Sequence, residues 1–448
     1  MCAFWRKAED KLLKWKENYS SQYAAIIEGA RRVGKSTVAQ EFAKKHYRSY
    51  IKIDFANVKK DVLAAFDDIA ELDIFFIRLQ AATGITLYEK ESVIIFDEIQ
   101  KFPVARQAIK YLVADGRYHY IETGSLLSIK KNVKDIVIPS EEYKIKMYPM
   151  DYEEFLRAIG SGNFETVQKL YALKRPVGNQ LNQKLLRDMR LYMCVGGMPQ
   201  AVDAYVKGKN FEEIDFVKRA IIDLYKDDFM KIDESGRISA MYEAIPSMLA
   251  QNKKRYTLSN VLGKRTTTKD EELLSNLLNS KTVLACYNTT DPKITLAQSK
   301  DFDSYKLYLA DTGLFTTMLF NDKSEVYSDI YIKLMGDKLD ANLGYLYENL
   351  IAQELAAAGH DLYYHTWQKP NSTHYYEIDF LLSQKTKLVP IEVKSSSVQH
   401  HDSISEFTKK YSDSTGEQYL LSQKDVGNLE QLQLKPIYMI PYIAQGKN

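Results

Sequence analysis

The sequence has few cysteines and no hydrophobic run long enough to cross a membrane. Its 448 residues include three cysteines, Cys2, Cys194 and Cys286, which lie far apart and form no C-x-x-C pair. This spacing argues against a disulfide framework or a structural zinc site, and it fits a reducing compartment. No stretch approaches the ~18 apolar residues of a membrane span, and the first ten residues lack the apolar core of a signal peptide. We therefore expect a cytoplasmic protein that does not enter a membrane.

The sequence also lacks a large charge of one sign. Its 61 basic and 59 acidic residues leave a net charge of +2, so the whole chain has no excess of positive charge for binding a polyanion. The charge is nevertheless segregated, because residues 1–50 hold 11 basic and 5 acidic side chains and residues 251–300 hold 9 and 4. These two basic segments are where we look for anionic ligands.

The length of the chain predicts about three domains. Residues 1 to about 155 alternate apolar strand-like runs with helical patterns, which is typical of a parallel α/β sheet. Residues 165–300 are mostly helical in pattern, and the chain after about 340 returns to an α/β pattern.

A phosphate-binding loop follows the first strand. The strand-like run 23–27 leads into Gly29-Ala-Arg-Arg-Val-Gly-Lys-Ser36, which fits G-x-x-x-x-G-K-[ST] and precedes a helical pattern. Glycines allow the backbone N–H groups to turn toward phosphate oxygens, and the helix N-terminus adds its dipole. Lys35 is expected to reach the β- and γ-phosphates and Ser36 to ligate Mg²⁺. The alternative is a glycine-rich structural turn.

An apolar strand that ends in two acids supplies the partner motif. In Ser92-Val-Ile-Ile-Phe-Asp-Glu98, Asp97 is expected to hold the Mg²⁺ shell and Glu98 to act as the general base for hydrolysis. The run 62–68 also ends in two acids, but its alanines favour a helix. After a third strand at 118–122, Ser125 is a candidate contact for the γ-phosphate, with an ordinary strand-to-helix turn as the alternative. The predicted nucleotide-binding residues are Gly29, Arg32, Gly34, Lys35, Ser36, Thr37, Asp97 and Ser125.

An ordered set of motifs resembles a large prokaryotic family of AAA-type P-loop ATPases with a C-terminal domain of unknown function. The resemblance covers nearly the whole chain and is carried by segments 29–37, 96–100, 123–125, 148–155, 196–199, 308–314 and 344–349. It implies ATP and Mg²⁺ as cofactors. Family members often carry an arginine shortly before the segment at 148–155, whereas residues 126–149 here contain none. The arginine finger would then come from Arg117, Arg157 or a partner subunit, which could be a second copy of the chain.

The middle of the chain contains a basic segment. Two short helices at 257–262 and 270–278 precede a strand at 282–287, an order that predicts a winged helix, and the family has one at this position. Its charge suggests contact with the phosphate backbone of DNA or RNA, although a solvated face of an interaction module is the alternative. The residues assigned to this contact are Lys253, Lys254, Arg255, Lys264 and Arg265. Gly196-Gly-Met-Pro199 is predicted to be a backbone turn.

The C-terminal part contains a D…E-x-K pattern on two strand-like runs. Glu377 and Asp379 share one face of the first run, and Glu392 and Lys394 share a face of the second. This pattern resembles restriction-endonuclease-like domains, whose preceding helix often adds an acid at the place of Glu348. Asp379, Glu392 and Glu348 are the predicted metal ligands, and Lys394 is expected to orient water or stabilise charge. The pattern E-x-K alone is weak, because it also occurs at Glu9 and Glu142.

We predict an α/β chain of four parts. These are a P-loop ATPase domain with an AAA-like parallel sheet at 1–155, a helical lid region at 156–235, a winged helix at 236–320 and a restriction-endonuclease-like domain at 321–448. The predicted function is ATP hydrolysis coupled to a metal-dependent, nuclease-like domain that acts on nucleic acid. The alternative is a nucleotide-driven switch or scaffold whose inactive C-terminal domain binds a protein.

Overall fold

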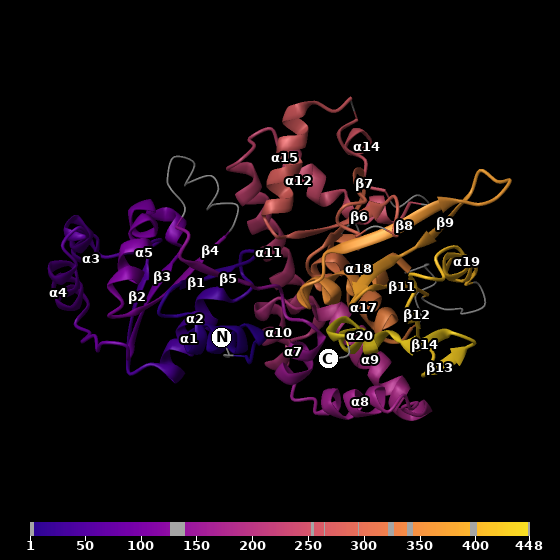
Figure 1. The fold of residues 1–448 in the computed structure, drawn as a ribbon, viewed down its shortest axis with the longest axis horizontal. Helices are drawn as coiled ribbons and strands as arrows, with labels where there is room; N and C mark the ends of the chain where they lie inside the picture. The colour runs from indigo at the N-terminus through magenta and orange to yellow at the C-terminus, as the bar shows by residue number, and fades with distance from the viewer. Residues whose placement is uncertain are drawn as a thin grey trace. The chain divides into compact units, whose positions relative to one another are not determined.

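The computed structural model describes residues 4–125, 139–251, 255–263, 265–293, 295–320, 327–337, 344–394 and 401–446. The chain forms two compact units (Figure 1). Unit 1 consists of Met1–Tyr148 and Asn279–Lys281, and unit 2 consists of Pro149–Leu278 and Thr282–Asn448.

Unit 1 is built on a five-stranded parallel sheet. The strand order is β2-β3-β4-β1-β5, and each neighbouring pair is parallel. The strands span Ala24–Glu28 (β1), Ser49–Asp54 (β2), Ser92–Asp97 (β3), His119–Gly124 (β4) and Glu142–Lys146 (β5). The buried runs of β1 and β3 explain why both lie inside the sheet. This architecture confirms the predicted P-loop NTPase fold.

Helices cover this sheet. α2 packs against β2, β3 and β4, and α5 packs against β4. The acidic run at 62–68 is helical, as predicted, and lies in α3 and the short 3₁₀ helix that follows it. The helices are α1 (Lys7–Asn18), α2 (Lys35–His46), α3 (Lys60–Ala65), α4 (Leu72–Thr83) and α5 (Pro103–Asp115).

The first half of unit 2 is helical. The predicted pair of short helices and the strand after them occur as α14 (Leu258–Leu262), α15 (Thr268–Asn279) and β6 (Val283–Thr289). The other helices before β6 are α7 (Tyr152–Ala158), α8 (Asn163–Ala172), α9 (Asn179–Val195), α10 (Pro199–Val206), α11 (Phe211–Met230), α12 (Arg237–Glu243) and α13 (Ile245–Leu249).

The second half of unit 2 contains two sheets. The order β7-β6-β8-β9 joins the hairpin of β6 and β7 (Lys300–Leu309) to β8 (Leu362–Gln368) and β9 (Tyr375–Ile378). The hairpin and the C-terminal region therefore share a sheet, although the predicted domain boundary lies between them. The second sheet has the order β10-β11-β12-β14-β13 and comprises Phe380–Gln384 (β10), Lys387–Val393 (β11), Gln418–Ser422 (β12), Gly427–Leu429 (β13) and Leu432–Pro436 (β14).

Five further helices occur in the described residues of this half of unit 2. The central one is α18, which contacts β6, β7, β8 and β11 and is buried along most of its length. The five are α16 (Thr312–Leu319), α17 (Tyr327–Met335), α18 (Gly344–Ala357), α19 (Asp402–Lys410) and α20 (Ile440–Gln445).

The turn after α9 docks against the start of α16. Asp311 caps α16 by accepting a hydrogen bond from the Leu314 N–H at 2.8 Å, and its other oxygen accepts one from the Gly197 N–H at 2.6 Å. Gly196 has φ +82°, and a Cβ on Gly313 would lie 2.5 Å from the Gly196 Cα. The two backbones therefore touch, which requires glycine on both sides.

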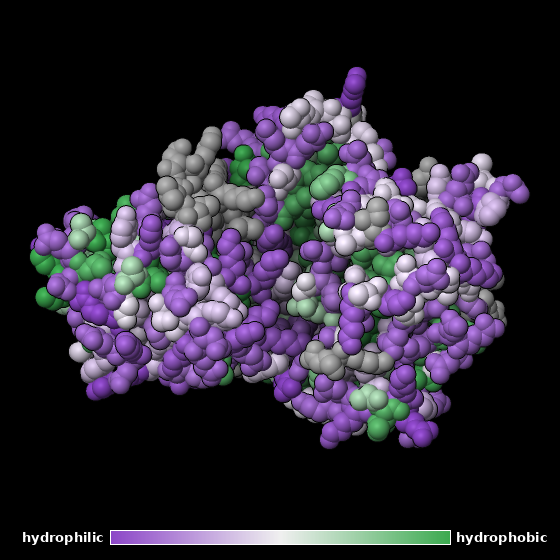
Figure 2. Space-filling view, viewed as in Figure 1, coloured by the Kyte–Doolittle hydropathy of each residue, from purple (hydrophilic) through white to green (hydrophobic). Residues whose placement is uncertain are grey.

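The surface in Figure 2 is mostly hydrophilic, with hydrophobic residues gathered over α3 and α4. On α4 the side chain of Ile77 is 66% exposed and that of Ile74 is 38% exposed. Within the described part of the chain, no helix combines the length and apolar character needed to cross a bilayer.

We expect Gly313→Ala to lower the free energy of unfolding by about 3 kcal/mol, because the new methyl group would meet backbone atoms that cannot move aside. Gly162→Ala is the matched control, since a Cβ there meets nothing within 4 Å, and it should change stability by less than about 1 kcal/mol. Urea unfolding measures both. Equal stability of the two variants would contradict the docking of these backbones.

Candidate functional site

The predicted phosphate loop connects β1 to α2. Gly34 has φ 99° and caps the helix, so Lys35 and Ser36 open its first turn. Arg32 also has a positive φ of 70° and is exposed, and Thr37 is exposed on the helix. A Cβ on Gly29 would lie 2.1 Å from the Met147 carbonyl oxygen, so only glycine fits there. The loop thus brings successive N–H groups to a helix N-terminus, which suits phosphate.

Lys35 lies within this loop. Its Nζ donates hydrogen bonds to the carbonyl oxygens of Gly29 at 3.0 Å and Ala30 at 2.9 Å. Burial lowers the pKa of Lys35 to about 8, although the negative charges of Glu98 and Asp97 act in the opposite direction. A buried lysine of this kind is available to exchange carbonyl partners for phosphate oxygens.

Asp97 contacts hydrogen-bond donors from three other elements. Its Oδ1 accepts hydrogen bonds from the Ser36 hydroxyl at 2.6 Å and from the Thr123 hydroxyl. Its Oδ2 lies 2.9 Å from the Nζ of Lys52 on β2. Burial alone would raise the pKa of Asp97, but the bonds from Ser36, Thr123 and Lys52 lower it below its usual value. The residue is therefore a carboxylate at neutral pH.

This donor set fits Mg²⁺. A serine hydroxyl and a carboxylate in contact are the hard oxygen ligands that the ion prefers, and they stand at the end of the phosphate loop. Ser36 and Asp97 are thus brought together as predicted. Thr123 and Lys52 were missed by the sequence analysis.

Glu98 and Ser125 follow the ends of β3 and β4. Glu98 adopts a left-handed φ of 53°, and its Oε2 accepts a hydrogen bond from the Gln100 side chain. Ser125 comes directly after β4, whereas Thr123 is the residue of that strand that contacts Asp97. Ser125 lies beyond the last residue of β4, and alternation along a strand would not have distinguished it from Thr123, two positions earlier.

A second group of acids lies where β9, β10 and β11 meet. Asp379 occupies the break between β9 and β10, and its Oδ2 accepts a hydrogen bond from the Val393 N–H at 2.8 Å. Glu392 is 4% exposed, and its Oε1 pairs with the Lys394 Nζ at 2.7 Å. Burial raises the pKa of Glu392 although Lys394 opposes the shift, and its Oε2 has no hydrogen-bond partner. The predicted trio Asp379, Glu392 and Lys394 is therefore assembled.

Lys306 on β7 lies next to acids of the same region. Its side chain is 0% exposed, and its Nζ lies 2.7 Å from Glu377 Oε1 and 3.8 Å from Glu348 Oε2. Tyr308 donates a hydrogen bond to Glu348 Oε2 at 3.2 Å. Burial would lower the pKa of Lys306, but Glu377, Glu348 and Asp379 together raise it above its usual value. The sequence signal for this role is that Lys306 interrupts the apolar run of β7.

Lys306 and Tyr308 are partners of Glu348. Among the residues with described positions, no three His, Cys, Asp or Glu side chains are grouped so that they could hold a metal ion. The predicted ligand set of Glu348, Asp379 and Glu392 is thus not gathered into such a group.

Of the residues predicted to contact nucleic acid, Arg255 and Arg265 are exposed. Lys253, Lys254 and Lys264 lie outside the described residues.

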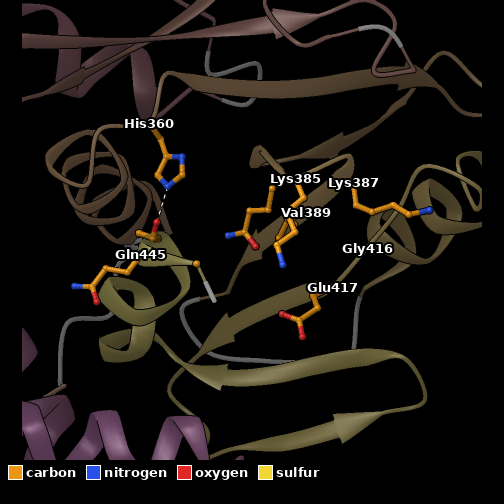
Figure 3. Close-up of a pocket in the computed structure, with 10 residues that line it drawn as sticks. His360, Lys385, Lys387, Val389, Gly416, Glu417 and Gln445 are labelled. Atoms are coloured by element: carbon orange, nitrogen blue, oxygen red, sulfur yellow. Dashed lines mark hydrogen bonds between the residues drawn. The ribbon is translucent and has the colours of Figure 1, made fainter. Parts of the chain in front are cut away.

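A pocket of about 390 Å³ lies at the other end of β11 (Figure 3). Lys387 at the start of that strand lines it, together with Lys385, Glu417 and His360, whose Nε2 is 2.6 Å from the Ala444 carbonyl oxygen. Because Glu392 and Lys394 come at the carboxyl end of the same strand, this pocket does not belong to the acidic group.

Three family models match successive parts of the chain. Residues 21–156 match an AAA domain, residues 186–325 match the domain of unknown function DUF8612, and residues 343–439 match the domain of unknown function DUF4143. No curated protein matches the chain.

Solved structures with low sequence identity also match. Cdc6p from Pyrobaculum aerophilum is 13% identical, with a TM-score of 0.24, over 74% of this chain and 93% of its own. The signal transduction ATPase PH0952 from Pyrococcus horikoshii is 9% identical, with a TM-score of 0.29, over 78% of this chain and 48% of its own. A chain of Drosophila ORC, solved bound to DNA, is 12% identical, with a TM-score of 0.26, over 68% of this chain and 91% of its own.

The family model and the geometry of unit 1 lead to the same conclusion. The match over residues 21–156 coincides with the parallel sheet, the phosphate loop and the Ser36–Asp97 pair. The N-terminal part of the chain is an AAA-type P-loop ATPase domain.

We expect Lys306→Met to destabilise the protein by about 3–5 kcal/mol, because it leaves the buried Glu348 and the partly buried Glu377 without their cation. The double variant Lys306→Met/Glu377→Gln removes one of these acids and should recover part of the loss. Urea unfolding of both variants and the wild type measures the effect. A Lys306→Met protein as stable as the wild type would mean that the ion pairs contribute nothing.

Proposed function

We propose that the chain binds and hydrolyses ATP in unit 1 and couples this reaction to a metal-dependent, nuclease-like C-terminal domain that acts on nucleic acid. The observation that carries the ATPase part is the contact of Ser36 with Asp97 beside the phosphate loop. Lys35, buried in the loop, binds the β- and γ-phosphates in place of the two carbonyl oxygens it now contacts.

Ser36 and Asp97 are the residues that would hold Mg²⁺, which neutralises negative charge on the phosphates. Glu98 accepts the proton of the attacking water, and its bond from Gln100 orients the carboxylate. Thr123 fixes Asp97 from the next strand. Both candidate arginines are engaged with acids, Arg117 with Asp115 and Asp73, and Arg157 with Glu153 and Glu165. These pairings favour a partner subunit, such as a second copy of the chain, as the source of the arginine finger.

We expect Lys35→Ala to abolish ATP binding, because the variant loses the cation that meets the phosphates. Glu98→Gln should bind ATP with wild-type affinity but lower kcat by about 10²-fold or more, since it cannot accept a proton. Filter binding and phosphate release measure the two steps separately. Lys45→Met, on the last turn of the same helix, is the control and should retain both activities. Hydrolysis that survives in both Lys35→Ala and Glu98→Gln would refute the assignment of this site.

The nuclease-like proposal rests on the acids at the carboxyl end of β11. β10 and β11 are antiparallel, and α19 then leads to β12, which is parallel to β11. Asp379 lies between β9 and β10, Glu392 lies on β11 and Lys394 directly follows that strand, in the order of restriction-endonuclease-like domains. Asp379 and the unpartnered Oε2 of Glu392 would hold a divalent cation, which activates water and stabilises charge on the phosphate. Lys394 orients that water. Arg255 and Arg265, with Lys253, Lys254 and Lys264, are proposed contacts to the DNA or RNA backbone.

One observation favours the alternative, a nucleotide-driven scaffold whose C-terminal domain binds a protein without cleaving nucleic acid. Lys306 already supplies one positive charge between Glu348 and Glu377, so part of the negative charge of the acidic group is compensated within the protein. An inactive domain would retain this arrangement for stability.

Cleavage separates the two functions. We expect the wild type with Mn²⁺ or Mg²⁺ to cut DNA or RNA and Asp379→Ala to lower the rate by at least about 10²-fold, because the variant lacks a metal ligand. Gel assays on single- and double-stranded substrates measure this, with EDTA as the metal-free control. Glu406→Ala changes a partly exposed acid of α19 and should cut at the wild-type rate. No cleavage by the wild type, or equal cleavage by Asp379→Ala, would refute the nuclease-like function and favour the scaffold function.

A further inference from the structure

The proposed Mg²⁺ site contains a cation of its own. Lys52 places its Nζ 2.9 Å from Asp97 Oδ2, while the hydroxyls of Ser36 and Thr123 donate to Oδ1. Both oxygens of Asp97 thus have partners from the protein, and one of these partners carries a full positive charge.

The strand arrangement explains how Lys52 reaches this point. β2 runs parallel to β3, with Lys52 opposite Ile95 and Asp54 opposite Asp97. The backbone of Lys52 therefore lies two residues before the end of β2. Its side chain must extend along the strand, over roughly 6–7 Å, to reach Asp97. Its neighbours Ile51 and Ile53 point to the buried face, so alternation puts Lys52 on the other face.

Other cations of unit 1 are engaged elsewhere. Lys35 donates to carbonyl oxygens of the phosphate loop. Four arginines of the described part of this unit form ion pairs with acids other than Asp97, and these pairs are Arg48–Glu91, Arg78–Asp68, Arg106–Glu142 and Arg117–Asp115. The ion pair of Asp97 is made by Lys52.

We propose that Lys52 is a positioning residue that competes with Mg²⁺ for Asp97 and thereby sets the Mg²⁺ concentration at which ATP binds. The proposal rests on the proposed ATPase function. A lysine ammonium and a divalent cation repel each other strongly when they share one carboxylate. The side chain of Lys52 is 25% exposed, so it can turn toward solvent when Mg²⁺ takes its place. Without Mg²⁺, Lys52 keeps Asp97 oriented toward the phosphate loop.

The experiment measures binding of a fluorescent ATP analogue to the full chain across a titration of MgCl₂, with EDTA at zero Mg²⁺ and with ATP as competitor. We expect Lys52→Met to lower the half-saturating Mg²⁺ concentration roughly tenfold or more, because the repelling charge is gone. Lys52→Gln keeps an N–H donor without the charge and should give the same shift, whereas Lys52→Arg keeps the charge and should stay within about threefold of the wild type. Thermal unfolding identifies which variants are folded, and either uncharged variant suffices.

Lys45→Met is the matched control. Lys45 forms an ion pair of 2.8 Å with Glu9 in the same unit, at the opposite end of α2 from the phosphate loop. A half-saturating Mg²⁺ concentration that is unchanged in the uncharged Lys52 variants, or that shifts equally in Lys45→Met, would overturn the proposal. Lys35→Ala tests the ATP site separately, because it should abolish binding at every Mg²⁺ concentration. Binding that persists there would refute the site itself and not only the role of Lys52.

Discussion

The ATPase domain depends on the hydrogen-bonded environment of one carboxylate. Asp97 lies at the end of β3, and it is bound by Ser36 from α2, Thr123 from β4 and Lys52 from β2. Burying a charge costs several kcal/mol unless donors and an opposite charge compensate for it. Each of these four elements therefore contributes to the stability of the carboxylate. The same contacts hold the phosphate loop, through Ser36, against the ends of the strands.

In unit 2, too, a lysine compensates the charge of buried acids. Lys306 of β7 pairs with Glu377 at 2.7 Å and lies 3.8 Å from Glu348. In both units the lysine comes from a strand and the acid from a different element, β3 for Asp97, β9 for Glu377 and α18 for Glu348. The difference lies in access, because Lys52 is 25% exposed and Lys306 is 0% exposed. Lys52 is able to leave its acid, whereas Lys306 is a fixed part of the core.

The sequence predicted those parts of the sites that are local in the chain. The phosphate loop, Asp97 and the E-x-K residues each lie in one short segment whose residue types define the chemistry. Lys52, Thr123 and Lys306 could not be assigned this way, because their roles depend on which strands become neighbours. Lys52 is 45 positions from Asp97, and only the order β2-β3-β4 brings it and Thr123 to the same carboxylate. Similarly, the pairing of β6 with β8 places the strand that was predicted to follow the two short helices of the winged helix in a sheet with the C-terminal region.

The charge balance of the acidic group bears on how its proposed chemistry would work. Two lysines lie beside four carboxylates of this region: Lys306 beside Glu377 and Glu348, with Asp379 also raising its pKa, and Lys394 beside Glu392. Counted as ionised, the group retains two negative charges, which is what one divalent cation neutralises. Lys306 pairs most closely with Glu377, at 2.7 Å, and Lys394 pairs with Glu392, at 2.7 Å, so the charge that the lysines leave over is that of Glu348 and Asp379. A divalent cation held by Asp379 and Glu392 would therefore supply the positive charge that the two lysines leave uncompensated in this group.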